Sequence, residues 1–491
     1  MHCRNHRRHG EELQAAEGSG PFSGNLPRRS PAVTRTRLAP ADGFQTCAFG
    51  TGAGIAPPAA VQGERLVRQF SAVAIWLLVV NGTIGAGIFG LPAEAARLTG
   101  AWSSLMFVLC GLLMAPIILC FGEVASYFRN TGGPILYATT AFGPFVGFQT
   151  GWALYVARVT SFAANINLVI SSLGWFWPAA DAGGIRVVLL FAICAALTWV
   201  NVVGARQAMR SVGVLTVLKL VPLLALVAFG LSRLDVGALV APASPLPAHS
   251  DIGAAALLLI YAYVGWESAL IPAGEARDPT RDIPRALIWG LAVTTVLYVL
   301  VQAVSVSVLP GLGSSPRPLV DVAAVVLGPA GAAVLTAGVI ASVGGNVAAS
   351  MFSAPRITYS MSIENNLPEW FGAVHPRFLT PAHSVVAYGV LVFVAAAFGS
   401  FAWLAGMSAL TRLGIYLLCI GALPRLRRLP GDPAGRLQLP GGWAIPIAAA
   451  AVCAWLLAQV HLDAVLVTLA FLAVGAVLHL LARRSRRGAV T

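Results

Sequence analysis

The chain has 491 residues, of which 57% are hydrophobic and only 10% are charged, and its mean hydropathy is +0.78. Soluble proteins carry about 25% charged residues, so this composition excludes a soluble enzyme, a disordered protein and a secreted disulfide scaffold. The net charge of +13 comes from 32 basic and 19 acidic residues, but the arginines are not interleaved with aromatics as in a nucleic-acid-binding face. The composition therefore predicts a polytopic membrane protein with no nucleic-acid partner.

The segment 1–62 is rich in Gly, Pro, Arg and Ala and shows no apolar periodicity. It contains no convincing signal-peptide core. Two interpretations remain open: a disordered cytoplasmic tail, or a start site assigned too early, with the functional protein beginning near Val61.

Beyond this segment, apolar runs recur at about 20 residues, the length that spans a bilayer. The sequence predicts twelve spans, with the boundary between the ninth and tenth marked only by Gly399, Ser400 and Phe401. The predicted spans are 71–96, 101–122, 141–172, 185–203, 211–231, 252–273, 286–308, 327–352, 382–400, 402–422, 442–460 and 463–482.

The arginines predict the orientation, because cytoplasmic segments of membrane proteins accumulate basic residues. With the N-terminus inside, eighteen arginines after residue 60 fall in cytoplasmic segments, including Arg356, which is placed in the loop after the eighth span. Four fall outside: Arg97, Arg186, Arg233 and Arg317. We therefore expect a cell-membrane protein with both termini in the cytoplasm.

The first span is interrupted by four glycines in nine residues, Gly82, Gly85, Gly87 and Gly90. Glycine weakens a helix, and unwound backbone in a membrane protein persists only against protein or a water-filled cavity. Close helix packing through small residues is the competing interpretation for Gly82 and Gly90. It accounts less well for the cluster of Gly85, Ala86 and Gly87.

The sixth span has a corresponding interruption at Gly265, next to Trp266 and Glu267. Two matched, glycine-interrupted spans indicate a transporter site built on inverted repeats. A helix that resumes after a break offers N–H groups to a carboxylate, whereas one that stops offers carbonyls to an ammonium group. An amino acid carries both groups on one carbon.

Several motifs along the chain, in order and spacing, resemble those of the amino acid–polyamine–organocation superfamily of permeases. The resemblance runs from about Arg65 to Arg428. Its motifs are Gly85-Ala86-Gly87-Ile88-Phe89, Gly122-Glu123, Thr131-Gly132-Gly133-Pro134 with Tyr137, Gly265-Trp266-Glu267, Glu275 with Asp278-Pro279, Ile283-Pro284-Arg285-Ala286, Arg356, Leu367-Pro368, His375-Pro376-Arg377 and Thr380-Pro381.

The resemblance implies an all-α membrane fold of the LeuT type, with five-plus-five inverted repeats, broken helices 1 and 6, and two extra helices. On this basis 63–424 is the ten-helix transport core, and 425–491 holds helices 11 and 12 with a basic cytoplasmic end. The implied substrate-binding residues are Ile84, Gly85, Ala86, Gly87 and Ile88 in span 1, and Tyr261, Ala262, Val264 and Gly265 in span 6. Among them, the N–H groups of residues 86–88 would bind the α-carboxylate, and Tyr261 would be an aromatic gate.

Charged residues inside spans are costly and usually functional. Lys219, the only lysine, lies in span 5 and either snorkels to the interface or, as in proton-coupled relatives, couples proton movement to span 1. Arg158 and Arg412 are expected to be structural pairs or gates, since arginine does not release its proton. Glu267 is expected to support the span-6 break and Glu123 to lie near a cytoplasmic gate.

Polar residues inside two spans are further candidates for the cavity wall. These are Asn165 and Asn167 in span 3, and Asn346 and Ser350 in span 8. The alternative is that they form hydrogen bonds between helices, as polar residues in membrane bundles more often do.

The sequence thus predicts a secondary transporter of amino acids that uses a proton gradient or a counter-substrate rather than a bound cofactor, as a monomer or homodimer. A polyamine or other amine is the second cargo considered, although it would call for more cavity acids than Glu123 and Glu267. A membrane enzyme is disfavoured because the sequence has no HExxH motif and no paired metal ligands within the apolar runs. Matched broken helices also suit alternating access better than a channel.

Overall fold

The computed structural model describes residues 71–128, 132–204, 212–234, 237, 245–270, 276–428 and 437–487. The side chains of 212–219, 279, 280 and 485–487 also lie outside the described part. The predicted tail, 1–62, is not among these residues. Those that are described form helices and no β-strand.

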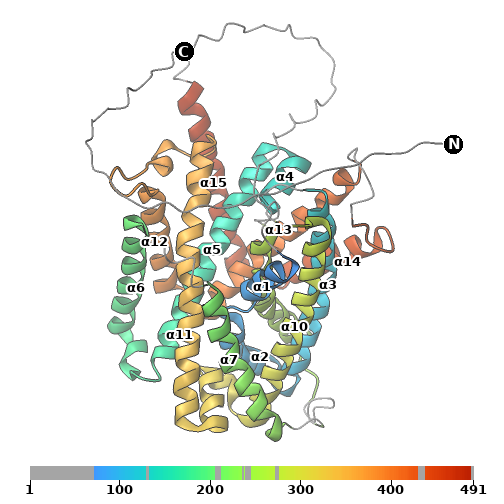
Figure 1. Ribbon diagram of the computed structural model, residues 1–491, viewed down its shortest axis with the longest axis vertical. Helices are drawn as coiled ribbons and strands as arrows, with labels where there is room; N and C mark the ends of the chain where they lie inside the picture. Colours follow the sequence, from blue (N-terminus) through green and yellow to red (C-terminus); the bar gives the residue numbers. More distant parts are fainter. Residues whose placement is uncertain are drawn as a thin grey trace, which may run out of the picture. The chain divides into compact units, whose positions relative to one another are not determined.

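The helices pack side by side, with α3 against α10, and α6 against α12 (Figure 1). Their bounds are α1 Ala72–Thr83, α2 Gly87–Thr99, α3 Ser103–Ser126, α4 Pro134–Phe142, α5 Pro144–Leu173, α6 Gly183–Val203, α7 Val212–Gly230, α9 His249–Ile260, α10 Pro279–Val308, α11 Pro318–Ile363, α12 Ala382–Phe398, α13 Phe401–Leu426, α14 Ala444–Leu457 and α15 Leu462–Arg487. Two short 3-10 helices, η5 (Tyr261–Tyr263) and η6 (Trp266–Leu270), follow α9.

Eight helical stretches of the described chain are long and apolar enough to cross a membrane. They are Gly87–Ser126, Pro144–Leu173, Gly183–Val203, His249–Leu270, Arg281–Val308, Pro318–Ile363, Phe401–Leu426 and Leu462–Arg484. Shorter apolar helices cover Ala72–Thr83, Leu220–Arg233, Ala382–Phe398 and Ala444–Leu457. The predicted number of twelve spans remains a prediction.

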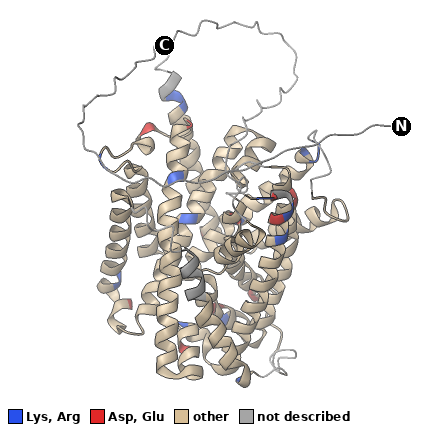
Figure 2. Ribbon diagram, viewed as in Figure 1, with Lys and Arg blue, Asp and Glu red and all other residues tan. Residues whose placement is uncertain are grey.

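The outer surfaces of these helices are apolar, as expected of a protein that faces lipid. On α6, Val188, Phe191 and Trp199 expose more than half of their surface, and charged residues are sparse along the helices (Figure 2). Water would penalise so much exposed apolar surface, whereas lipid does not. The chain is therefore a multi-pass membrane protein.

Local signals set the ends of several helices. Ser400 caps α13 by accepting a hydrogen bond from Trp403 N at 3.2 Å, so only Gly399 and Ser400 separate α12 from α13. Within α11, Gly328 has φ of +73° and produces a kink just before Pro329. The same helix continues to Ile363, so the sequence prediction for Arg356 was wrong: this residue lies in α11 and not in a loop.

Helix α5 lies at the centre of the bundle and contacts α4, α11, α12 and α13. Asn167 on α5 donates hydrogen bonds to Ala396 O at 3.2 Å and Gly399 O at 3.0 Å, and accepts one from Arg186 Nη2 at 2.8 Å. It therefore ties α5 to the end of α12 and to α6. For Asn167 the interhelical alternative is correct.

A partly buried ion pair joins α3 to the end of α13. Arg427 donates from Nε and Nη2 to the two carboxylate oxygens of Glu123, at 2.7 and 2.8 Å. Glu123 is 1% exposed, and the guanidinium of Arg427 also stacks over the ring of Trp443. This two-pronged geometry is the strongest that a carboxylate and an arginine can form.

We expect Glu123→Gln to destabilise the protein by about 1–3 kcal/mol, because the variant loses hydrogen bonds to a charged group. The readout is the apparent melting temperature of the detergent-solubilised protein. Glu94→Gln is the matched control, because Glu94 pairs with Arg97 at a partly exposed position, where ion pairs contribute little. Equal melting temperatures for the two variants would contradict this role of Glu123.

Candidate functional site

The first predicted break separates α1 from α2. Helix α1 ends at Thr83 and α2 begins at Gly87, with Ile84 in a non-helical conformation. The N–H groups of Phe89 and Gly90 bond to Ala86 O, both at 3.1 Å. The N–H groups of Gly87 and Ile88, which precede Phe89, have no acceptor within α2, as at the start of any helix. The break thus offers N–H groups and the positive end of a helix dipole.

The second break follows α9. The chain passes from η5 through Val264, which is extended, and Gly265, which has φ of +108°, into η6. Such a φ favours glycine. The N–H of Gly265 donates to Glu267 Oε2 at 2.8 Å. A carboxylate from the same segment therefore satisfies unwound backbone, as predicted for Glu267.

The two breaks lie against each other. A side chain at Gly82 would come within 2.5 Å of Gly265 O, and one at Gly87 within 2.6 Å of Ala262 Cα. Such distances are too short for a carbon atom, so both contacts require glycine. Gly82 and Gly87 are packing glycines, whereas at Gly85 the nearest atom would be Asn346 Nδ2, at 3.4 Å.

Tyr298 on α10 bridges the two breaks from outside the cavity lining. Its hydroxyl lies 3.0 Å from both Thr83 O and Ala262 O, and its single O–H proton is shared between these two acceptors. Both carbonyls belong to interrupted helices, so this one buried hydroxyl satisfies backbone groups in each. The sequence analysis did not single out Tyr298, because nothing in its apolar run marks it.

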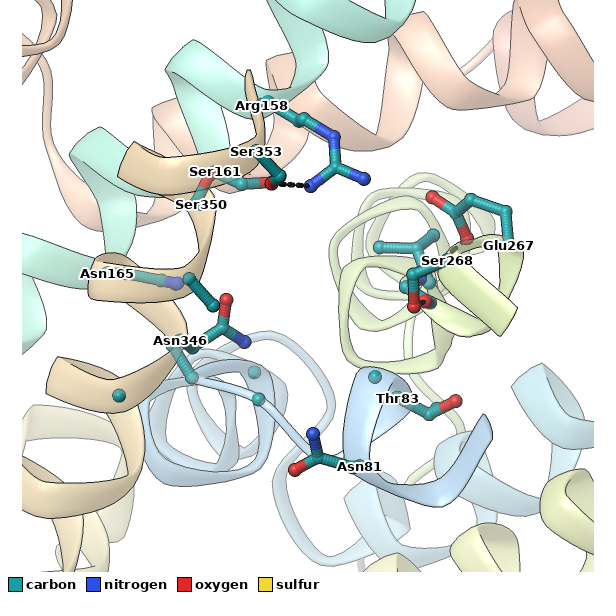
Figure 3. A pocket seen from close by; sticks show the side chains of 18 of the residues that line it. Asn81, Thr83, Arg158, Ser161, Asn165, Glu267, Ser268, Asn346, Ser350 and Ser353 are labelled. Carbon is teal, nitrogen blue, oxygen red and sulfur yellow. Dashed lines mark hydrogen bonds between the residues drawn. The ribbon is translucent and has the colours of Figure 1, made fainter. Parts of the chain in front are cut away.

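A cavity of about 390 Å³ opens beside the breaks. It is walled by α1, α2, α5, η5, η6, α11 and α13, and Figure 3 shows its polar side chains pointing inward from several of them. The lining residues are Leu78, Asn81, Gly82, Thr83, Gly85, Ala86, Gly87, Arg158, Ser161, Asn165, Tyr261, Val264, Gly265, Glu267, Ser268, Ser342, Gly345, Asn346, Ala349, Ser350, Phe352, Ser353 and Arg412.

Most of the predicted site residues meet at this cavity. Those that line it are Gly85, Ala86, Gly87, Tyr261, Val264, Gly265, Glu267 and Arg158, together with the polar candidates Asn165, Asn346 and Ser350. Ile84, Ile88 and Ala262 lie beside it, without being part of its lining. Glu123 lies elsewhere, in its pair with Arg427. The side chain of Lys219, on α7, is outside the described residues.

Glu267 and Arg412 form a buried ion pair at the cavity wall. Arg412 Nε donates to Glu267 Oε1 at 2.7 Å, and Tyr416 OH donates to Oε2 at 3.2 Å. Arg412 Nη1 also donates to Ser161 Oγ at 3.0 Å and to Ser408 Oγ. The pair connects η6, α13 and α5. The sequence could not assign it, because 145 residues separate the partners.

Tyr261 is held in place at the cavity by two neighbours. Its hydroxyl donates to Asn165 Oδ1 on α5 at 2.9 Å. Its ring meets that of Phe401 edge to face, with centroids 6.2 Å apart. This position, between α5 and α13, is compatible with the predicted gate.

Arg158 occupies a different part of the same wall. Its Nη1 donates to Ser353 Oγ on α11 at 3.3 Å, and its own carbonyl accepts from Tyr388 OH at 3.1 Å. Figure 3 shows the guanidinium turned into the cavity, on the side away from Asn81 and Thr83.

The described residues contain no group of three or more His, Cys, Asp or Glu side chains that could hold a metal ion. The polar chemistry of the cavity instead consists of helix ends, hydroxyls, amides and three charged groups. Such a set can bind a small polar molecule.

Comparison with known proteins identifies the family. Residues 70–479 match the family model described as amino acid permease. The chain is 26% identical to the methylthioribose transporter of Bacillus subtilis, over 80% of this chain and 88% of that protein. It is 26% identical to a serine/threonine exchanger of the same organism, over 64% and 73%. It is 25% identical to that organism's branched-chain amino acid permease, over 87% and 95%.

The family match covers the broken helices, the cavity and nearly all the described chain. Together with the motifs noted in the sequence, it shows that this chain belongs to the amino acid permease family, within the amino acid–polyamine–organocation superfamily of transporters.

Proposed function

We propose that the protein is a secondary transporter that carries an amino acid across the cell membrane by alternating access. The observation that carries this proposal is the pair of interrupted helices that meet at one polar cavity. In an apolar bundle, unwound backbone is tolerated where it lines such a cavity, and paired breaks of this kind form the substrate sites of transporters.

The α-carboxylate of the substrate binds at the start of α2. The lining residues Gly85, Ala86 and Gly87 bring backbone to the cavity where the helix dipole is positive. An anion there is stabilised without a positively charged side chain. Only a small residue permits such close approach of the ligand to the backbone.

The α-amino group binds at the opposite break, near the carbonyls of Tyr261 and Val264, both of which line the cavity. The carbonyl of Ala262 is a poorer partner than the family resemblance implies, because Tyr298 already donates to it and Ala262 lies outside the lining. The two breaks together recognise the groups that all α-amino acids share.

Alternating access requires the half-helices to move relative to the bundle. The twelve-span arrangement with LeuT-type inverted repeats and cytoplasmic termini supplies such movement, with α1 and η6 as mobile parts. Helix α1 packs directly against η6, and at Gly82 a side chain would meet Gly265 O and Ser268 Oγ, so these two parts move together.

Proton coupling through Lys219 or exchange against a second substrate drives transport. Lys219 is the only lysine and lies in an otherwise apolar run of α7. Burial favours the neutral form of a lysine, which arginine cannot reach. Exchange is the activity named for the serine/threonine exchanger of Bacillus subtilis.

A polyamine is the weaker cargo. Among the described lining residues Glu267 is the single carboxylate, and Arg412 already pairs with it. A polycation would meet two arginines in the wall and find no free acid among those residues.

The first test is uptake into proteoliposomes with a panel of radiolabelled amino acids and polyamines, with and without a pH gradient and with and without internal substrate. We expect saturable uptake of at least one amino acid and none of the polyamines. The proposal fails if no amino acid is taken up in either uptake or exchange mode.

We expect Gly87→Ala to lower the uptake rate about tenfold or more. The added methyl group forces the two breaks apart, and overpacking of this kind costs ~1–3 kcal/mol. A rise of about 1.36 kcal/mol in the free-energy barrier of the transport cycle lowers the rate tenfold. Gly344→Ala is the matched control, because a methyl group there would meet nothing within 4 Å. Wild-type uptake by the Gly87 variant, with expression confirmed, would show that the contact is dispensable.

If Lys219 couples transport to protons, Lys219→Gln will transport without the pH dependence of the wild type. Lys219→Arg will keep the charge but lose the coupling, because arginine stays protonated. Uptake measured from pH 5 to pH 8 distinguishes these outcomes. An unchanged pH profile in Lys219→Gln would exclude a coupling role for this residue.

A further inference from the structure

Arg158 is a cavity arginine that forms no close ion pair with any described residue. Among the described residues no carboxylate lies within 4.0 Å of its guanidinium, which donates a hydrogen bond to the neutral hydroxyl of Ser353. The other arginine that lines the cavity, Arg412, is paired with Glu267. A charge within an apolar bundle is costly without a partner, so the position of Arg158 in the cavity calls for an explanation.

The charges that line the cavity do not balance. They are Arg158, Arg412 and Glu267, and the Glu267–Arg412 pair neutralises itself, which leaves one positive charge. Lys219, whose side chain is not described, adds no negative charge in either protonation state. A zwitterionic amino acid is neutral and would leave this excess in place, whereas an amino acid with one additional negative charge would cancel it.

The position of Arg158 matches the place of a substrate side chain. The proposed binding sites for the α-carboxylate and α-amino groups lie at the two breaks. Arg158, on α5, lies across the cavity from Asn81 and Thr83 of α1 (Figure 3). Ser350 and Ser353 of α11 lie beside it and supply further hydroxyls to the same end of the cavity.

We propose that Arg158 selects amino acids with an anionic side chain, such as glutamate or aspartate, by pairing with the side-chain carboxylate. This assignment rests on the proposed amino acid transport and names its substrate class. The guanidinium offers several N–H donors in a planar fork that fits a carboxylate. Ser353 keeps the side chain directed into the cavity while the site awaits substrate.

The test compares uptake of L-glutamate with that of L-glutamine, its neutral isostere, into proteoliposomes. We expect the wild type to prefer glutamate by about tenfold or more, which corresponds to ~1.4 kcal/mol. Arg158→Gln should bring this ratio close to one while glutamine uptake persists. Arg158→Lys should retain part of the preference, because it keeps the charge.

Arg97→Gln is the matched control, because Arg97 pairs with Glu94 away from the cavity, and its glutamate-to-glutamine ratio should equal that of the wild type. A wild type that takes up glutamine as well as glutamate would overturn the proposal, whether or not the variants fold. Equal loss of both substrates in Arg158→Gln would overturn it too, since Arg158 would then bind a group common to all amino acids.

The same assay separates this proposal from the proposed function. Saturable uptake of neutral amino acids alone would leave amino acid transport standing and refute the role of Arg158. Uptake of no amino acid at all would refute both.

Discussion

The carboxylate of Glu267 is the point on which the site depends. It accepts hydrogen bonds from Gly265 N, Arg412 Nε and Tyr416 OH, so it satisfies unwound backbone and a buried cation together. Without it, Gly265 would lose its partner in an apolar bundle and Arg412 would be a second unpaired charge. Removing one member of a buried pair typically costs ~3–5 kcal/mol. The break in the sixth span can therefore exist because an acid follows it by two residues.

A shared hydrogen-bond donor also explains why the two breaks lie together. Each ends a helix whose carbonyls need donors, and Tyr298 serves Thr83 and Ala262 with one hydroxyl. The close approach that this requires is available because Gly82 and Gly87 have no side chains. Two interruptions that would be costly apart are stabilised by a shared set of contacts. In the proposed alternating-access cycle, that shared set couples the movement of one half-helix to the other.

The sequence could predict the breaks, because glycine clusters and a nearby acid are local signals, and it offered residues of spans 3 and 8 as candidates for the cavity wall. It could not predict pairings over long separations: Glu267 with Arg412, Glu123 with Arg427, or Tyr298 with two carbonyls. These depend on how helices are rotated about their axes, which apolar runs with little amphipathic pattern do not record. Asn167 and Asn165 show the limit, since they are two residues apart on α5, yet one ties helices together and the other lines the cavity.

Backbone groups at the breaks can recognise only what all amino acids share, so discrimination among them must come from side chains on the remaining walls. On α5 and α11 those side chains are mostly small hydroxyls and amides, which accept many ligands. Arg158 is different, because it carries a full charge and has no carboxylate within ion-pair distance among the described residues. If such a charge stayed unpaired in every state of the protein, its desolvation would lower the stability and no interaction would offset this cost. The desolvation cost is offset when the substrate supplies the anion. The pairing of Arg158 with a substrate carboxylate then both stabilises the bound state and discriminates against neutral amino acids.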